Sequence, residues 1–187
     1  MPRTRTWIVL GLVLAAAAAR LVPHVPNFTP VEAMALFGGA YLGDRRAALL
    51  APLAALFASD LVLGYAVYGY GLAYPGMAFV YLAVAAIAVL GGLLGARAGA
   101  GRVALGALGA ASLFFLVTNF GVWLTGGLYP HSPEGLLACY TAALSFFRYT
   151  LAGTVLYSAL LFGGFTLARR RFPARPRSGS GLRGVTP

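Results

Sequence analysis

Ionisable side chains inside apolar stretches are the residues of this sequence whose chemistry most needs an explanation. Asp60 lies near the end of one apolar run, and Glu32 lies at the start of a shorter one. Arg20 and Arg148 stand at the ends of two others. Charged groups within a bilayer are costly and mark ion pairs, relays or binding sites. We therefore expect Asp60 to pair with Arg20 or with Arg148, and either pair can also contact a ligand.

Glu32 belongs to a pattern that is typical of a helix start. In Thr29-Pro30-Val31-Glu32, Thr stands at the N-cap, Pro at the first helical position and Glu three residues after the cap. Two roles stay open for Glu32, which either completes a capping box or contacts a ligand. The helix N-terminus that begins here could also attract an anionic group.

Further polar and aromatic residues complete a candidate binding set. Asn119 either bonds a neighbouring helix or contacts a ligand, and Trp123 belongs either to an interface belt or to a stacking platform. The candidate substrate-binding residues are Arg20, Asn27, Thr29, Glu32, Asp60, Asn119, Trp123 and Arg148. The sequence holds no His-Glu-x-x-His zinc motif and no Gly-x-Ser-x-Gly elbow, so we expect neither an enzyme nor a metal or cofactor site.

The composition is that of an integral membrane protein. Hydrophobic residues make up 60% of the chain and charged residues 10%, against about 45–50% and 25% in soluble domains. The 14 basic residues are all Arg and give a net charge of +10. Because they flank apolar runs, bilayer orientation explains them better than nucleic-acid binding does.

Hydropathy predicts one all-α transmembrane domain over residues 1–168. Its six expected spans are residues 7–22, 30–42, 47–65, 77–94, 103–124 and 149–168. Residues 135–147 are interpreted as a surface segment that Arg148 separates from the last span. A cleaved signal peptide remains an alternative for the first run. The basic tail, residues 169–187, is expected to be disordered and to lie near anionic lipid.

The distribution of arginines predicts the orientation. With six spans, the arginines outside helix ends fall on one side, which places both termini in the cytoplasm and the protein in the bacterial inner membrane. At 1.5 Å per residue, Arg20, Asp60 and Asn119 would lie roughly 20–24 Å from the inner face. The polar residues therefore predict an outward-facing pocket in the outer half of the bundle.

Three segments carry a resemblance to known membrane proteins. They are NFTPVEAMALFGGAYLGDRR, LFFLVTNFGVWLTGGLYP and GLLACYTAALSFFRYTLAGTVLYSALLFG, within residues 21–164. They resemble an uncharacterised family of bacterial integral membrane proteins, and more broadly the substrate-binding S components of energy-coupling-factor (ECF) vitamin transporters.

The resemblance implies an S-component-like bundle that captures a vitamin or related metabolite and reorients on a coupling protein with two ATPases. The docking contact of that fold would map to Ala15 and Ala19, which with Gly11 form a seam of small residues in the first span. Solitary relatives use a cysteine on cobalt, for which Cys139 is the candidate here, although the same residue also reads as an apolar filler. A non-transporting membrane scaffold of the same fold is the alternative function.

Overall fold

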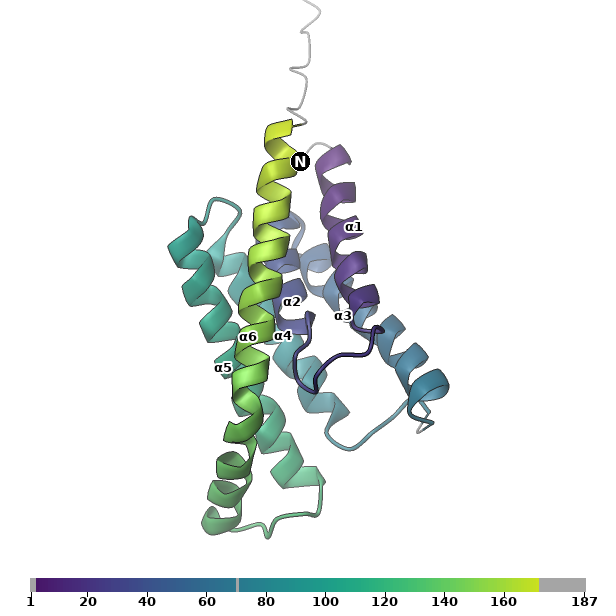
Figure 1. The fold of residues 1–187 in the computed structure, drawn as a ribbon, viewed down its shortest axis with the longest axis vertical. Coiled ribbons are helices and arrows are strands. Elements are labelled where there is room, and N and C mark those ends of the chain that lie inside the picture. The colour runs from purple at the N-terminus through teal and green to yellow at the C-terminus, as the bar shows by residue number, and fades with distance from the viewer. Residues whose placement is uncertain (1–2, 70, 172–187) are drawn as a thin grey trace, which may run out of the picture.

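The structure is a computed structural model that describes residues 3–69 and 71–171, with the side chains of residues 6–69 and 71–170. This part of the chain is all-helical, as predicted, and contains no strand (Figure 1). Its elements are α1 (Arg3–Ala19), α2 (Val31–Tyr41), α3 (Arg45–Val62), the π-helical turn η1 (Leu63–Val67), α4 (Met77–Leu94), α5 (Ala100–Thr125) and α6 (Pro133–Arg171). Residues 172–187, where most of the expected basic tail falls, lie outside the described part.

Four helical stretches are long and apolar enough to cross a membrane. They are Arg45–Val67, Met77–Leu94, Ala100–Thr125 and Pro133–Arg170. The apolar part of α1, Thr6–Ala19, is shorter, and α2 has only 11 residues. The chain therefore has the character of a membrane protein with four long apolar helices. That α1 and α2 also cross the membrane, which would give six spans, stays a prediction.

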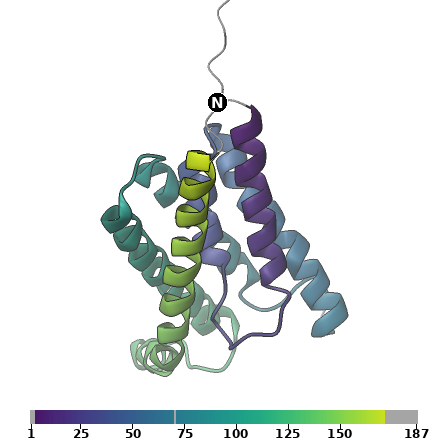
Figure 2. The ribbon, with the colours of Figure 1, turned by 45° about the horizontal axis from the view of Figure 1, so that its top comes forward.

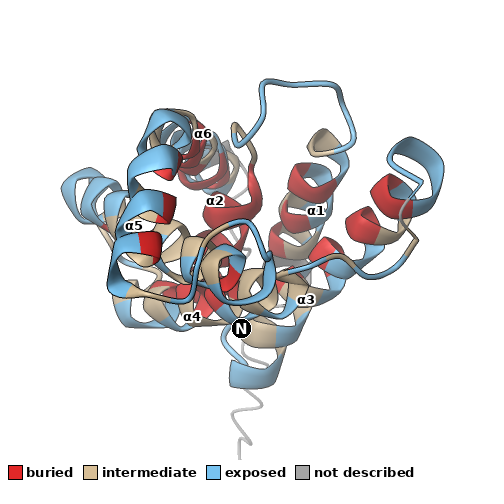
Figure 3. Ribbon diagram, turned by 90° about the horizontal axis from the view of Figure 1, so that it is seen from below, coloured by how far each residue is buried: buried red, intermediate tan, exposed pale blue. Residues whose placement is uncertain are grey.

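Helix α2 forms the centre of the bundle. All 11 of its residues are buried, and the other five α-helices pack around it (Figure 3). A Cβ atom on Gly39 would collide with the backbone of Ala88 in α4, and one on Gly91 would collide with the backbone of Leu36. Only glycine fits at such a crossing, so α2 and α4 pack backbone against backbone. Helix α2 is therefore covered by protein along its whole length.

The starts of α6 and α2 differ in their capping. Ser132 caps α6, because the Gly135 N–H donates to its Oγ at 3.2 Å. The predicted cap at Thr29 is wrong. Pro30 occupies the N-cap position of α2 and no side chain caps this helix. Thr29 therefore lies one residue outside the helix, and its hydroxyl donates to the Glu32 carboxylate at 3.5 Å.

Helix α6 is continuous from Pro133 to Arg171, so the predicted interruption at Arg148 is wrong. Its 39 residues extend over about 58 Å at 1.5 Å per residue, well beyond the ~30 Å of a bilayer core. The charge of Arg148 does not break the helix because it leaves the backbone hydrogen bonds intact. The side chain is exposed, with its guanidinium 4.7 Å from the ring centre of Tyr149.

Successive helices alternate in direction and define two ends of the bundle. The start of α1 and the end of α6 lie at one end, together with the α2–α3 and α4–α5 turns (Figures 1 and 2). We call this the arginine end, since residues 3–5, 45–46, 97–102 and 169–171 carry the arginines there. The linker end is the opposite end, where residues 20–30 join α1 to α2.

Candidate functional site

A buried ion pair joins α1 to α3 at the linker end. Nη1 of Arg20 donates to Oδ1 of Asp60, and it also lies 2.8 Å from the Ser59 hydroxyl oxygen. The Tyr81 hydroxyl of α4 donates to the other Asp60 oxygen at 2.9 Å. Only 1% of the Asp60 side chain is exposed and 16% of that of Arg20. The sequence left Arg20 and Arg148 open as partners of Asp60, and in the structure the partner is Arg20.

Local structure brings these groups together. Asp60 lies in the last turn of α3, immediately before the π-helical turn η1, and such turns are frequent at functional sites. Arg20 follows the last residue of α1, in a turn where its amide bonds the carbonyl of Ala17. The packing of α1 against α3 therefore places the guanidinium beside the carboxylate.

Glu32 is a second buried acid at the same end, with 1% of its surface exposed. It lies in the first turn of α2, where its closest side-chain hydrogen bond is the 3.5 Å contact from Thr29. The side chain of Thr154 also interacts with it. However, the single hydroxyl proton of Thr154 is donated at 2.7 Å to the carbonyl of Thr150. The backbone amide of Glu32 also donates to this carboxylate, so its described hydrogen-bond partners are all neutral groups.

Two adjacent cavities lie beside these acids. The first, which we call the linker cavity, has a volume of about 140 Å³, and Arg20, Asn27, Thr29 and Glu32 contribute to its wall. The second, the side cavity, measures about 250 Å³ and includes Asn119. Both are bounded by Asn27, Val80 and Phe114. Five of the eight predicted binding residues therefore line one cavity or the other, and Asp60 lies directly behind Arg20.

The linker, residues 20–30, covers this region and rests on α6. Gly153 allows the close approach, since a Cβ atom there would lie 3.0 Å from the amide nitrogen of Thr29. The ring of Phe28 packs at a tilt against that of Tyr157 of α6, with ring centres 5.9 Å apart. Asn27 is exposed and adopts a left-handed conformation with φ of 64°. Figure 2 shows the linker crossing between α1 and α6, where it can act as a cover.

The remaining candidates lie elsewhere or bond locally. Arg148 points to the surface and contacts the hydroxyl of Tyr149 at 3.0 Å. Trp123 donates its indole N–H to the carbonyl of Pro130 at 2.9 Å and forms no part of either cavity wall. The Asn119 amide donates to the carbonyl of Phe115 in its own helix at 2.7 Å. The structure does not bring Arg148 and Trp123 to the linker cavity, and a ligand role for them stays a prediction.

The seam of small residues in α1 faces away from the bundle. Gly11 and Ala15 are exposed, and no atom lies within 4 Å of a Cβ built on Gly11. The buried face of α1 is formed by other residues, among them Val9, Val13 and Ala16. Within the described chain, the seam of Gly11, Ala15 and Ala19 is therefore not the packing surface, and docking on it stays a prediction.

Sequence reasoning missed three side chains of this site. Ser59 and Tyr81 bond the ion pair, and Thr154 interacts with Glu32. Tyr81 had a usable signal, since a tyrosine in the middle of an apolar run needs a partner for its hydroxyl group. Serine and threonine are common in packed membrane helices, so the sequence does not distinguish Ser59 and Thr154 from residues that serve packing alone.

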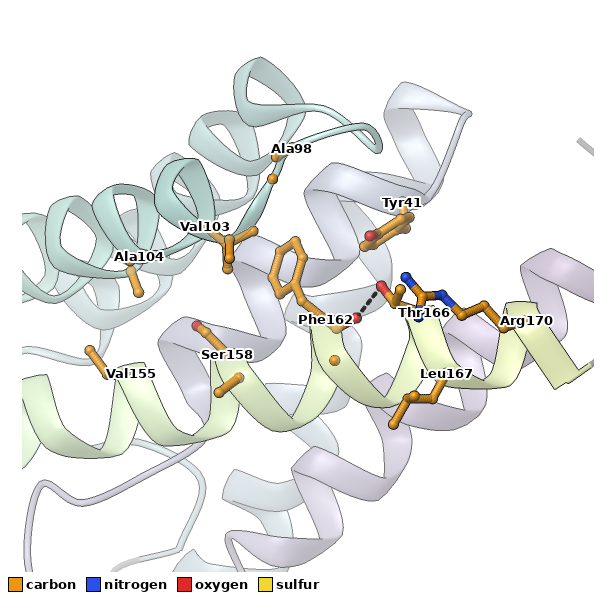
Figure 4. Close-up of a pocket in the computed structure, with 15 residues that line it drawn as sticks. Tyr41, Ala98, Val103, Ala104, Val155, Ser158, Phe162, Thr166, Leu167 and Arg170 are labelled. Atoms are coloured by element: carbon orange, nitrogen blue, oxygen red, sulfur yellow. Dashed lines mark hydrogen bonds between the residues drawn. The ribbon is translucent and has the colours of Figure 1, made fainter.

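A larger hollow lies at the arginine end. This arginine-end groove, between the start of α5 and the last third of α6, has a volume of about 640 Å³ (Figure 4). Small and apolar residues such as Ala104, Val155 and Leu167 line it, with Arg170 near one end. The hydroxyl of Ser158 is buried here and has no hydrogen-bond partner.

The single cysteine of the chain lies on α6. Cys139 is buried, and its Sγ lies 3.5 Å from the carbonyl oxygen of Asn119. Within residues 3–69 and 71–171, no three His, Cys, Asp or Glu side chains gather closely enough to hold a metal ion.

Comparison with known proteins places the chain in one family. A family profile described as a family of unknown function (DUF6580) matches residues 1–175. The chain belongs to this family. No curated protein matches the chain, and no solved structure matches it. The polar groups of the linker cavity are thus the main observation on which a function can be argued.

Proposed function

We propose that the protein is a membrane-embedded uptake protein that binds a small vitamin-like metabolite in the linker cavity. The observation that carries this proposal is that Arg20 and Glu32 line one cavity, with Asp60 bonded to Arg20 beside it. Two of the chain's four acidic residues are buried here. Burying charges in a membrane protein costs stability, and such residues are retained where they serve substrates or ions.

The orientation that we propose puts this cavity in the outer half of the membrane. Arginine-rich segments favour the cytoplasmic side, so the arginine end faces inward and both termini are cytoplasmic. In this arrangement α1 and the buried α2 complete six spans together with the four long helices. The linker cavity then opens toward the outside of a bacterial inner membrane, where an uptake protein must meet its substrate.

The proposed mechanism follows the S-component resemblance. A ligand enters beneath the linker, residues 20–30, and binds beside Glu32 and Asn27. The linker closes over it against Gly153 of α6. The bundle then reorients to release the ligand inward, either alone or on an ECF-type coupling protein with ATPases. In the second case, the exposed seam of Gly11, Ala15 and Ala19 is available for docking.

The proposal is tested by identifying what the purified protein binds. Mass spectrometry of small molecules released from the protein should detect a ligand, and adding this compound back should raise the melting temperature. Val80→Phe, which fills the wall shared by both cavities, should abolish the rise. Val89→Phe is the matched control, because Val89 is on the same helix and 59% exposed.

The alternative function predicts a different result. A non-transporting scaffold would release no compound from the purified protein. Any added compound would then change the melting temperatures of Val80→Phe and Val89→Phe by the same amount. Either of these outcomes would remove the uptake proposal and leave a membrane-embedded bundle of the same fold.

A further inference from the structure

We propose that the ligand of the linker cavity is an organic cation, an ammonium group on an apolar or aromatic body, which binds against Glu32. This inference rests on the proposed function and specifies its substrate class. It depends on how the charges of the described residues are paired, which the sequence left open.

The charges around the linker cavity do not balance. Arg20 and Asp60 form an ion pair, and the Nη1 atom of Arg20 is shared between Asp60 and Ser59. The positive charge nearest to the cavity is therefore already matched. Arg148, the other cation that the sequence offered, is exposed and contacts Tyr149 instead. Glu32 remains as an acid without a matching cation among the described residues that line the cavity.

The hydrogen bonds of Glu32 indicate the same deficit. An ionised carboxylate offers about four acceptor positions, and burial without strong donors is unfavourable. Here the donors are the backbone amide of Glu32 itself, a long contact from Thr29 and the hydroxyl of Thr154, whose proton is used elsewhere, and none of them carries a charge. An ammonium group supplies up to three N–H donors and a positive charge, so it would satisfy both needs of this carboxylate.

An anionic ligand fits the same place poorly. The N-terminus of α2 would attract an anion through its free amides, but Glu32 already places a carboxylate in that first turn. A second negative group bound there would be repelled by this carboxylate. Because Glu32 lies in the first turn of α2, this helix start favours the binding of a cation and disfavours the binding of an anion.

The walls suit an apolar body behind the charge. Tyr74 and Phe114 contribute to the linker cavity, and Phe115, Phe146 and Phe147 contribute to the side cavity. Aromatic faces attract cations as well as apolar groups. A ligand that extends from Glu32 past Phe114 would thus place its ammonium group at the acid and its body among aromatic rings.

Three probes of matched shape test this inference: phenethylamine, phenylacetate and 2-phenylethanol. They carry an ammonium group, a carboxylate and a hydroxyl group on the same short aromatic arm. Each is added to the purified full-length protein at constant ionic strength, and binding is measured by calorimetry and thermal shift. We expect phenethylamine to bind and raise the melting temperature, 2-phenylethanol to bind more weakly, and phenylacetate to have no effect.

Glu32→Gln identifies the group responsible. It keeps the shape of the side chain and should weaken phenethylamine binding by about thirtyfold or more. Glu134→Gln is the matched control, because Glu134 is exposed at the start of α6 and should leave binding unchanged. The inference is overturned if phenylacetate binds as well as phenethylamine, or if Glu32→Gln binds like the wild type. It is also overturned if phenethylamine shows no binding up to about 10 mM.

Failure of this inference is distinguishable from failure of the proposed function. If mass spectrometry identifies an anionic or neutral ligand whose effect Val80→Phe abolishes, the uptake proposal stands and the cation is wrong. If no compound is found and none of the three probes binds, both proposals fall together.

Discussion

The linker cavity measures about 140 Å³ and is bordered by charged groups, whereas the arginine-end groove measures about 640 Å³ and is walled mainly by small and apolar side chains. In the cavity, Arg20, Asp60 and Glu32 lie within one cluster. In the groove, the buried polar group without a partner is the single hydroxyl of Ser158. In a membrane protein, size is therefore the weaker guide to function, because lipid chains readily occupy apolar grooves.

The comparison also predicts what stabilises each end. At the arginine end, rings of α2 and α6 pack together, with Tyr41 and Phe165 centred 4.4 Å apart. At the linker end, an ion pair and hydrogen bonds connect α1, α3 and α4. Substitutions at the first end should reduce stability through lost packing, and those at the second through uncompensated charge.

The largest expected effect is that of Phe165→Ala at the arginine end. Phe165 is fully buried and contacts the rings of Phe37 and Tyr41. Its loss should reduce the free energy of unfolding by about 4 kcal/mol, measured by denaturation in mixed micelles. Leu160→Ala is the control, because Leu160 is 58% exposed on the same helix. Equal losses in both variants would contradict the packing core that we place here.

Asp60→Asn should cost about 3 kcal/mol, because it leaves Arg20 without a counter-charge in a largely buried position. Asp44→Asn is a matched control with almost no cost, since Asp44 caps α3 and Asn is an equally good cap. Thermal or chaotrope denaturation of the two variants gives the comparison. If both variants are as stable as the wild type, the ion pair does not stabilise the linker end.

Gly153→Val should displace the linker and cost about 2 kcal/mol, since its side chain would press on the backbone of Thr29 and Phe28. Proteolysis within residues 20–30 should become faster. Gly163→Val, ten residues further along the same helix, meets open space in the groove and should change neither quantity. Similar behaviour of the two valine variants would show that the linker does not rest on α6.

The smallest expected effect is that of Ser158→Ala, which removes a buried hydroxyl without a partner and should raise stability by up to about 1 kcal/mol. Thr154→Val, one turn earlier, removes a hydroxyl bonded to Thr150 and should lower stability by about 0.6 kcal/mol. Denaturation curves of the two variants should thus shift in opposite directions. A loss on Ser158→Ala would mean that this hydroxyl is bonded in the native protein.

Parts of this structure could be predicted from the sequence because they depend on local patterns. The apolar run 77–94 coincides with α4, since Gly76 and Gly95 mark both of its ends. Asp60 was recognised because an acid in an apolar run needs a partner. The choice between Arg20 and Arg148 depends on which helices pack together, and sequence spacing does not contain that information.

The errors have equally local causes. The charge of Arg148 predicts an interruption, but a charged side chain on the side of a helix leaves the backbone hydrogen bonds intact, and Arg is a good helix former. The cap at Thr29 failed because Pro30 took the N-cap position. The isolation of Glu32 was not predicted, since it follows from the three-dimensional pairing of the other charges.

The glycine crossing of α2 and α4 has a consequence for how the molecule could move. Because Gly39 and Gly91 let the two backbones touch, sliding one helix along the other would drive carbonyl groups into neighbouring atoms. These helices should therefore travel as one rigid unit that carries Glu32 and Tyr81 together. If α1 swings away from this unit and from α3, the contact between Arg20 and Asp60 must break.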